Sequence, residues 1–185
     1  MQRRLICAVT AACVTISSAA AIGTPASQHE SHQGTASPVV AAVREAIERY
    51  RDVNDAIAAG YAQFQGCVSG PAEGAMGVHF AKGELFDGTV DVRNPEVLVY
   101  EPRNGRLRLV AAEYIVPSEA WDPAHDPYDK PHLLGHLFHY APAPNRYGGT
   151  PFYELHVWAG KPNPHGAFAD WNPNVSCADW EGSPL

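Results

Sequence analysis

The sequence predicts a mainly β domain of α+β type, a small barrel or sandwich that carries one amphipathic α-helix at its N-terminal end. Three observations support this fold class. Short apolar runs with a two-residue alternation recur beyond residue 65, Gly and Pro separate these runs, and the segment before them has apolar residues at helical spacing. Many short strands joined by irregular loops are typical of sandwiches and small barrels.

The first 21 residues have the pattern of a secretory signal peptide. Arg3 and Arg4 precede an apolar, small-residue run that ends in Ala19-Ala20-Ala21. The run is short for a membrane anchor, which needs roughly 20 apolar residues. We therefore predict cleavage, a secreted or periplasmic location, and no membrane attachment after cleavage.

Two further ranges complete the predicted domain organisation. Residues 22–37 are small and polar without a period, which predicts a disordered leader in which His29 and His32 are solvated. Residues 38–185 are predicted to form a single metal-binding, β-rich domain.

Cys67 and Cys177 are the two cysteines that remain after removal of residues 1–21. In an oxidising compartment such a pair predicts a disulfide, and joint metal ligation by both thiols is the alternative. The formal net charge of -7 and the lack of a Lys/Arg stripe exclude a nucleic-acid-binding function.

One helix and four strands are predicted in order along the chain. The helix begins at Ser37, a capping residue followed by Pro38, and ends near Gly60. The strands are predicted at 75–81, 96–100, 106–116 and 152–159. Asn104-Gly105 is a tight-turn sequence, so the second and third strands are predicted to form an antiparallel hairpin.

Three of these strands carry a polar residue where an apolar one is expected. His79 alternates with Val78 and Phe80, and His156 shares a face with Phe152, Glu154 and Trp158. Glu113 shares a predicted face with four apolar residues, namely Leu107, Leu109, Ala111 and Ile115. A buried carboxylate must be protonated, paired or bound to metal.

The segment 132–140 contributes a further histidine, and two readings of it remain open. As a helix it aligns His132, His136 and His139 on one face. As a strand, which the following Pro142 and Pro144 favour, it makes His139 the inward residue and His136 the reserve.

One transition-metal ion would satisfy these buried polar groups together. We predict His79, Glu113, His139 and His156 as its ligands, with Glu154 as a fifth ligand or as an acceptor that orients an imidazole. Imidazole-rich sites suit copper, zinc, iron or manganese rather than calcium or magnesium. The side chains predicted to wall an adjoining pocket are Phe80, Phe152 and Trp158.

The ligand set of three His and one Glu resembles the metal centre of cupins, small barrels that hold a mononuclear ion facing a pocket. Cupins carry two His one residue apart, whereas this chain has Glu154-Leu155-His156 and no His-x-His. The runs 74–80, 152–158 and 168–173 also resemble a group of uncharacterised exported bacterial proteins, a likeness that implies no activity.

Three functional hypotheses follow from the residues. The first is a metal-dependent redox enzyme or hydrolase, in which a coordination position stays open to water or a small-molecule ligand. The second is a non-catalytic carrier of a metal or a small ligand, and the third is a structural domain in which His and Glu pair by hydrogen bonds. His165 and Asp170 are read either as groups at the pocket mouth or as ordinary loop polarity.

Overall fold

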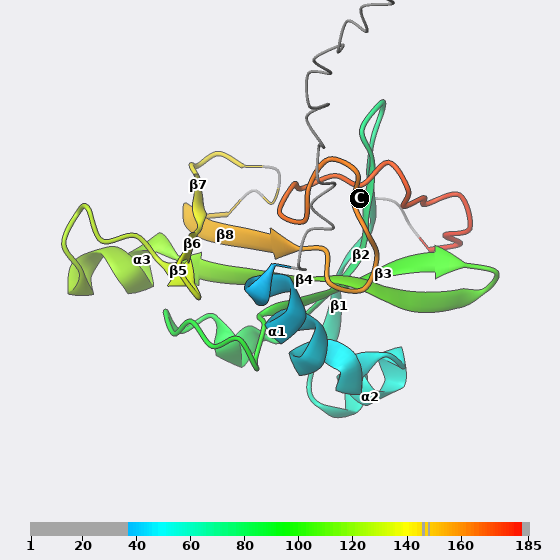
Figure 1. Cartoon of the computed structure of the whole chain (residues 1–185), viewed down its shortest axis with the longest axis horizontal. Coiled ribbons are helices and arrows are strands. Elements are labelled where there is room, and N and C mark those ends of the chain that lie inside the picture. The colour runs from blue at the N-terminus through cyan, green and yellow to red at the C-terminus, as the bar shows by residue number, and fades with distance from the viewer. Residues whose placement is uncertain (1–36, 146, 148, 183–185) are drawn as a thin grey trace, which may run out of the picture. The chain divides into compact units, whose positions relative to one another are not determined.

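One six-stranded antiparallel sheet, in the order β1-β2-β3-β4-β8-β7, curls into a half-barrel and carries most of the fold (Figure 1). The structure is a computed structural model that describes residues 37–145, 147 and 149–182. Its strands are β1 (Ala62–Gly70), β2 (Gly74–Ala81), β3 (Val97–Arg103), β4 (Arg106–Pro117), β7 (His139–Ala141) and β8 (Phe152–Val157). A two-stranded sheet pairs β5 (His132–Leu133) with β6 (His136–Leu137). The predicted mainly β class is confirmed.

The predicted N-terminal helix is broken into two pieces. Helix α1 (Pro38–Ile47) continues as a 3₁₀ turn (Glu48–Tyr50), and α2 (Val53–Ala58) follows. The break occurs because Asp52 leaves the helical conformation and its side chain accepts a hydrogen bond from the Asn54 amide, which caps α2. Three short helical elements lie elsewhere: Gly83–Leu85, α3 (Ser118–Trp121) and Asp122–Ala124.

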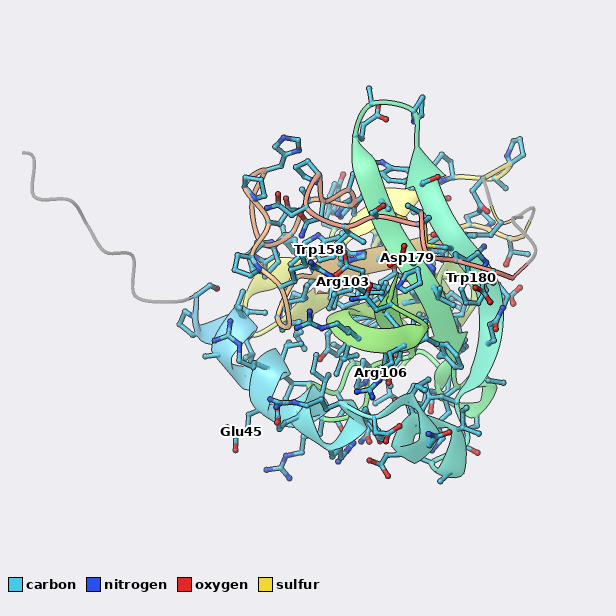
Figure 2. All side chains as sticks on the ribbon, turned by 90° about the vertical axis from the view of Figure 1, so that its right-hand side faces the viewer. Glu45, Arg103, Arg106, Trp158, Asp179 and Trp180 are labelled. Carbon is cyan, nitrogen blue, oxygen red and sulfur yellow. A yellow bond between two sulfur atoms is a disulfide. The ribbon has the colours of Figure 1, made fainter. Side chains whose placement is uncertain are left out.

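Helix α1 packs on one face of the sheet, which we call the helix face. Its buried residues Val39, Val40, Val43 and Ile47 belong to the same apolar cluster as the sheet residues of that face. Those sheet residues are Val78, Phe80, Leu98, Tyr100, Ala112, Tyr114, Leu155 and Val157. Glu45, on the outer side of α1, points away from the sheet (Figure 2).

The opposite face, which we call the site face, is covered by part of the C-terminal segment, residues 160–182, and by Tyr147, whereas Phe168 and Trp180 of that segment pack on the helix-face cluster. Its apolar residues Val97, Val99, Ala111, Ile115, Phe152 and Trp158 cluster with Val175 and Tyr147. Figure 2 shows Trp158 on the side of the sheet away from Glu45. Both faces are therefore buried, as the sequence predicts for the last strand.

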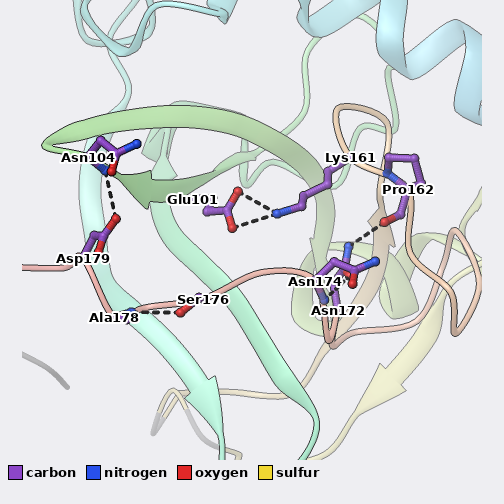
Figure 3. A network of polar contacts seen from close by, with 9 residues as sticks. All are labelled: Glu101, Asn104, Lys161, Pro162, Asn172, Asn174, Ser176, Ala178 and Asp179. Atoms are coloured by element: carbon purple, nitrogen blue, oxygen red, sulfur yellow. Dashed lines mark hydrogen bonds and ion pairs between the residues drawn. The ribbon is translucent and has the colours of Figure 1, made fainter.

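Several contacts fasten the C-terminal segment to the sheet (Figure 3). Asp179 accepts a hydrogen bond from the Asn104 amide, and Lys161 pairs with Glu101 at 2.8 Å. The Cys67–Cys177 disulfide links the segment to β1 across 110 residues of sequence. The predicted disulfide is confirmed.

Strand positions agree with the prediction within a few residues for β2, β3, β4 and β8. Asn104 and Gly105 both have positive φ, 52° and 70°, so the predicted tight turn joins β3 to β4. Strand β1 was not predicted as a separate element. The reading of residues 137–140 as a strand is correct in part, because β6 and β7 are separated at Phe138.

A register shift in β4 corrects the predicted face of that strand. Val99 pairs with Ala111 and Tyr100 pairs with Leu109, so Val110 is an extra residue in a β-bulge. The bulge moves Leu107 and Leu109 to the helix-face cluster, while Glu113 remains on the site face.

The predicted signal peptide, 1–21, and the leader, 22–37, lie outside the described residues apart from Ser37, so both stay predictions. In the described part of the chain no helix is long and apolar enough to cross a membrane.

Candidate functional site

Glu113 lies at the centre of the site face, between two histidines. Its cross-strand partner in the β4–β8 ladder is His156, and Nδ1 of that imidazole lies 2.9 Å from Glu113 Oε1. His79 reaches the same oxygen from β2, with 3.4 Å between its Nε2 and Glu113 Oε1. Three strands thus bring together three residues that the sequence predicts as inward polar groups.

The three side chains are almost completely removed from solvent, with exposed fractions of 1% for His79 and 2% for Glu113 and His156. Burial raises the pKa of Glu113, but attraction to His79 and the hydrogen bond from His156 outweigh burial and lower that pKa below its usual value. Glu113 is therefore an ionised carboxylate inside the protein. Because an ionised carboxylate only accepts, His156 donates to it from Nδ1.

Several polar atoms near Glu113 have no hydrogen-bond partner among the described residues. They are Nδ1 and Nε2 of His79, Nε2 of His156 and Oε1 of Gln65. The 3.4 Å separation between His79 Nε2 and Glu113 Oε1 is longer than the 2.7–3.2 Å of ordinary hydrogen bonds. Gln65 is 7% exposed and pairs with His79 in the β1–β2 ladder.

Gln65, His79 and Glu113 line a cavity of about 190 Å³ on the site face, whereas His156 is not among its lining residues. The rest of the lining is mainly apolar: Phe64, Phe86, Val97, Ile115, Pro117, Tyr147 and Phe152, with Asn145, Gly149 and Thr150. The ring of Tyr147 lies 6.4 Å from that of Phe64 and 5.7 Å from that of Phe152, so it joins β1 to β8 across the cavity. The result is a pocket with apolar walls and a polar end formed by Gln65, His79 and Glu113.

The three residues predicted as pocket walls have different positions. Phe152 lines the pocket, as predicted. Phe80 lies on the helix face, where its ring packs 5.3 Å from that of Tyr100, so its predicted role is corrected. The β-strand alternation that turns His79 toward the pocket necessarily turns Phe80 away. Trp158 packs against the His156 ring at 4.6 Å and is not among the lining residues.

His139 lies apart from the buried trio, in a second group on the same face. It pairs with Glu154 in the β7–β8 ladder, and both residues approach Asp170 from the C-terminal segment. Ligand atoms of these three residues all lie within 4.8 Å of one another. Within the described ranges, His79, Glu113 and His156 do not form such a group. His136, the reserve ligand, stacks on Phe168 at 3.7 Å.

Two site residues were missed or undervalued by sequence reasoning. Gln65 lies in β1, which the sequence did not distinguish from the end of the helix, and its alternation with buried Cys67 was the available signal. Asp170 lies in a segment without secondary structure, and no periodicity reveals which way its side chain points.

The geometry can support ligand binding and proton transfer. An ionised carboxylate that contacts imidazoles in a buried, apolar-walled site is the arrangement in which an imidazole is oriented to accept or donate a proton.

Comparison of the chain with models of known families, with curated proteins and with solved structures found no match. The resemblances to cupins and to exported bacterial proteins therefore stay predictions.

Proposed function

We propose that this protein binds a small, mostly apolar molecule that carries a hydrogen-bond donor, in the pocket lined by Gln65, His79 and Phe152. The observation that carries this proposal is the set of unpartnered polar atoms of Gln65 and His79 at the end of an apolar cavity. A buried polar atom without a partner costs about 1–3 kcal/mol. A donor group on the ligand would remove that cost for each atom it reaches.

The size of the pocket limits the ligand. Its volume of about 190 Å³ equals that of about six water molecules, at ~30 Å³ each in the liquid. A compound with one six-membered ring or a short branched chain is of that size.

The polar end of the pocket is rich in acceptors. The Glu113 carboxylate only accepts, and the unpartnered atom of Gln65 is a carbonyl oxygen. His79 offers a lone pair or an N–H according to its tautomer. Amines and hydroxyl compounds therefore match this end better than carboxylates, which Glu113 would repel.

The proposal is tested with pairs of compounds of equal size that differ in the donor group. We expect phenol and benzylamine to bind and to shift the NMR signals of Ile115 and Val97, while toluene and ethylbenzene bind more weakly. The Gln65→Ala variant should weaken binding of the compound that contacts it about fivefold, since one neutral hydrogen bond contributes ~1 kcal/mol.

Gln63→Ala is the matched control, because Gln63 lies on the same strand, is exposed and is not among the lining residues. It should bind as the wild-type protein does. Equal affinity for phenol and toluene, or NMR shifts that lie outside the pocket, would overturn the proposal.

Proton-transfer catalysis in the same pocket is the second candidate function. The contact between Glu113 and His79 favours it, because an adjacent carboxylate orients an imidazole and stabilises its protonated form. Turnover of a bound compound that is lost in His79→Gln, while binding persists, would favour an enzyme. Binding without turnover would favour a carrier.

We also propose that the protein works outside the cytoplasm, in a secreted or periplasmic location. The Cys67–Cys177 disulfide supports this, since disulfides persist in oxidising compartments. The signal-peptide pattern of residues 1–21 supports it independently. A cell-fractionation experiment in which the protein stays in the cytoplasm at full length would contradict the proposal.

A further inference from the structure

We propose that His139, Glu154 and Asp170 form a binding site for one divalent transition-metal ion, separate from the small-molecule pocket. Each residue offers one ligand atom, and these atoms all lie within 4.8 Å of one another. Two ligands of one ion at ~2.1 Å from it are at most about 4.2 Å apart. The three side chains therefore need to move by only a fraction of an ångström to about one ångström to share an ion.

The sheet holds two of the three ligands in place. His139 and Glu154 are direct partners in the antiparallel β7–β8 ladder, so their side chains project from the same face as neighbours. Glu154 also pairs with Ile115 on β4, which fixes β8 from its other side.

The third ligand is held by its neighbours in the C-terminal segment. The carbonyl of Ala169 accepts a hydrogen bond from Trp158 Nε1 at 2.5 Å, and the carbonyl of Trp171 accepts one from Asn163 at 2.8 Å. Asp170 lies between these two anchored carbonyls. The backbone of Asp170 is thus held on both sides.

The chemistry of the three side chains selects the class of ion. Two carboxylates close to each other repel, and a divalent cation removes that repulsion. An imidazole together with carboxylates suits zinc, manganese or ferrous iron, whereas calcium and magnesium prefer oxygen ligands throughout. His139 is exposed and the two acids are half-buried, so three protein ligands leave coordination positions open to water.

The buried trio is a weaker candidate for the same ion. Glu113 Oε1 already contacts both His156 and His79, and the three described side chains do not gather their ligand atoms within 4.8 Å of one another. The metal predicted from the sequence is therefore assigned to the outer group, which shares His139 and the predicted alternative ligand Glu154 with the predicted ligand set.

Titration of the chelator-treated, exported protein with Zn²⁺ or Mn²⁺, followed by calorimetry, tests the site. We expect one equivalent to bind, and His139→Ala and Asp170→Asn each to weaken binding at least tenfold. His139 is exposed and Asp170 is half-buried, and neither belongs to the apolar core, so circular dichroism should show an unchanged fold. The Mn²⁺ form should show one nitrogen ligand by electron spin-echo spectroscopy.

Two controls separate this site from other histidines. His165→Ala changes an exposed histidine of the same segment and should leave affinity unchanged. His29→Ala with His32→Ala should also leave it unchanged, which excludes binding by the leader. No stoichiometric binding, or equal affinity in wild type, His139→Ala and Asp170→Asn, would overturn the proposal. Gln65→Ala, which tests the pocket, should not affect metal binding.

Discussion

His156 and Glu113, 43 residues apart in sequence, meet through a hydrogen bond of 2.9 Å inside the sheet, where each is 2% exposed. The pairing of β4 with β8 places them opposite each other, so the strand pairing itself brings the Glu113 carboxylate next to the His156 imidazole. His79 arrives from β2, on the other side of β3. The Glu113 carboxylate on β4 therefore contacts side chains of β8 and β2, which lie on opposite sides of β4 in the sheet.

Removing the carboxylate of Glu113 should destabilise the fold strongly. We expect Glu113→Ala to lower the free energy of unfolding by about 3–5 kcal/mol, because two imidazoles would lose their buried partner. Glu113→Gln keeps one acceptor oxygen and should cost less. Urea unfolding at neutral pH measures both. Glu73→Ala, at an exposed position, is the control, and an equally large loss there would contradict this account.

The strands and their inward polar residues were predictable because they depend on local sequence. The two-residue period fixes which face of its own strand each of His79, Glu113 and His156 occupies. The pair Asn104-Gly105 specifies the turn between β3 and β4. A buried polar residue in an apolar strand needs a partner, and the structure does bring the side chains of His79, Glu113 and His156 together, while the predicted metal ion stays a prediction.

The remaining features depend on contacts that the local sequence does not encode. The bulge at Val110 depends on how β3 twists against β4, so the strict alternation assigned Leu107 and Leu109 to the wrong face. The sequence prediction groups His139 with the buried trio, because residue spacing cannot show that His139 of β7 pairs with Glu154, two residues before His156 on β8.

Gly77 should tolerate no side chain, because it approaches the neighbouring strand closely. Its φ is 123°, and an added Cβ would lie 2.5 Å from the carbonyl oxygen of Tyr100. Gly77→Ala should therefore lower the free energy of unfolding by more than about 1 kcal/mol, the usual cost of an incompatible backbone position. It should also displace His79, two residues along the strand, and weaken binding in the pocket.

Gly83→Ala is the matched control for this substitution, because nothing lies within 4 Å of its added Cβ. Thermal unfolding of both variants measures the difference. Equal melting temperatures would show that β2 can move away from Tyr100, and would contradict the close-approach argument.

The Cys67–Cys177 disulfide should contribute substantially to stability, because it closes a loop across 110 residues. On the chain-entropy model the contribution is about 4–5 kcal/mol. The double variant Cys67→Ser with Cys177→Ser should unfold at lower urea concentration, and reducing agent should destabilise the wild type but not this variant. Equal sensitivity of both proteins to reducing agent would refute the assignment of the effect to this bond.

Glu96 should make stability fall as the pH rises. It is 2% exposed, its Oε2 accepts a hydrogen bond from the Ile115 amide, and burial raises its pKa from 4.5 to about 8. Between these two values the folded protein holds a proton that the unfolded chain has released, so the free energy of unfolding declines with pH. The total decline from this group is on the order of 5 kcal/mol, at ~1.4 kcal/mol per pKa unit.

Replacement of Glu96 by Gln should remove this pH dependence, since the amide keeps an acceptor for the Ile115 N–H but cannot ionise. The variant should match the wild type near pH 4.5 and be more stable than it above pH 8. Urea unfolding from pH 4 to pH 9 measures the difference between the two proteins, in which the titration of groups common to both cancels. Glu84→Gln, at an exposed position, should keep the wild-type slope. A Glu96→Gln variant with the same slope would mean that the carboxyl ionises in the folded protein as freely as in water.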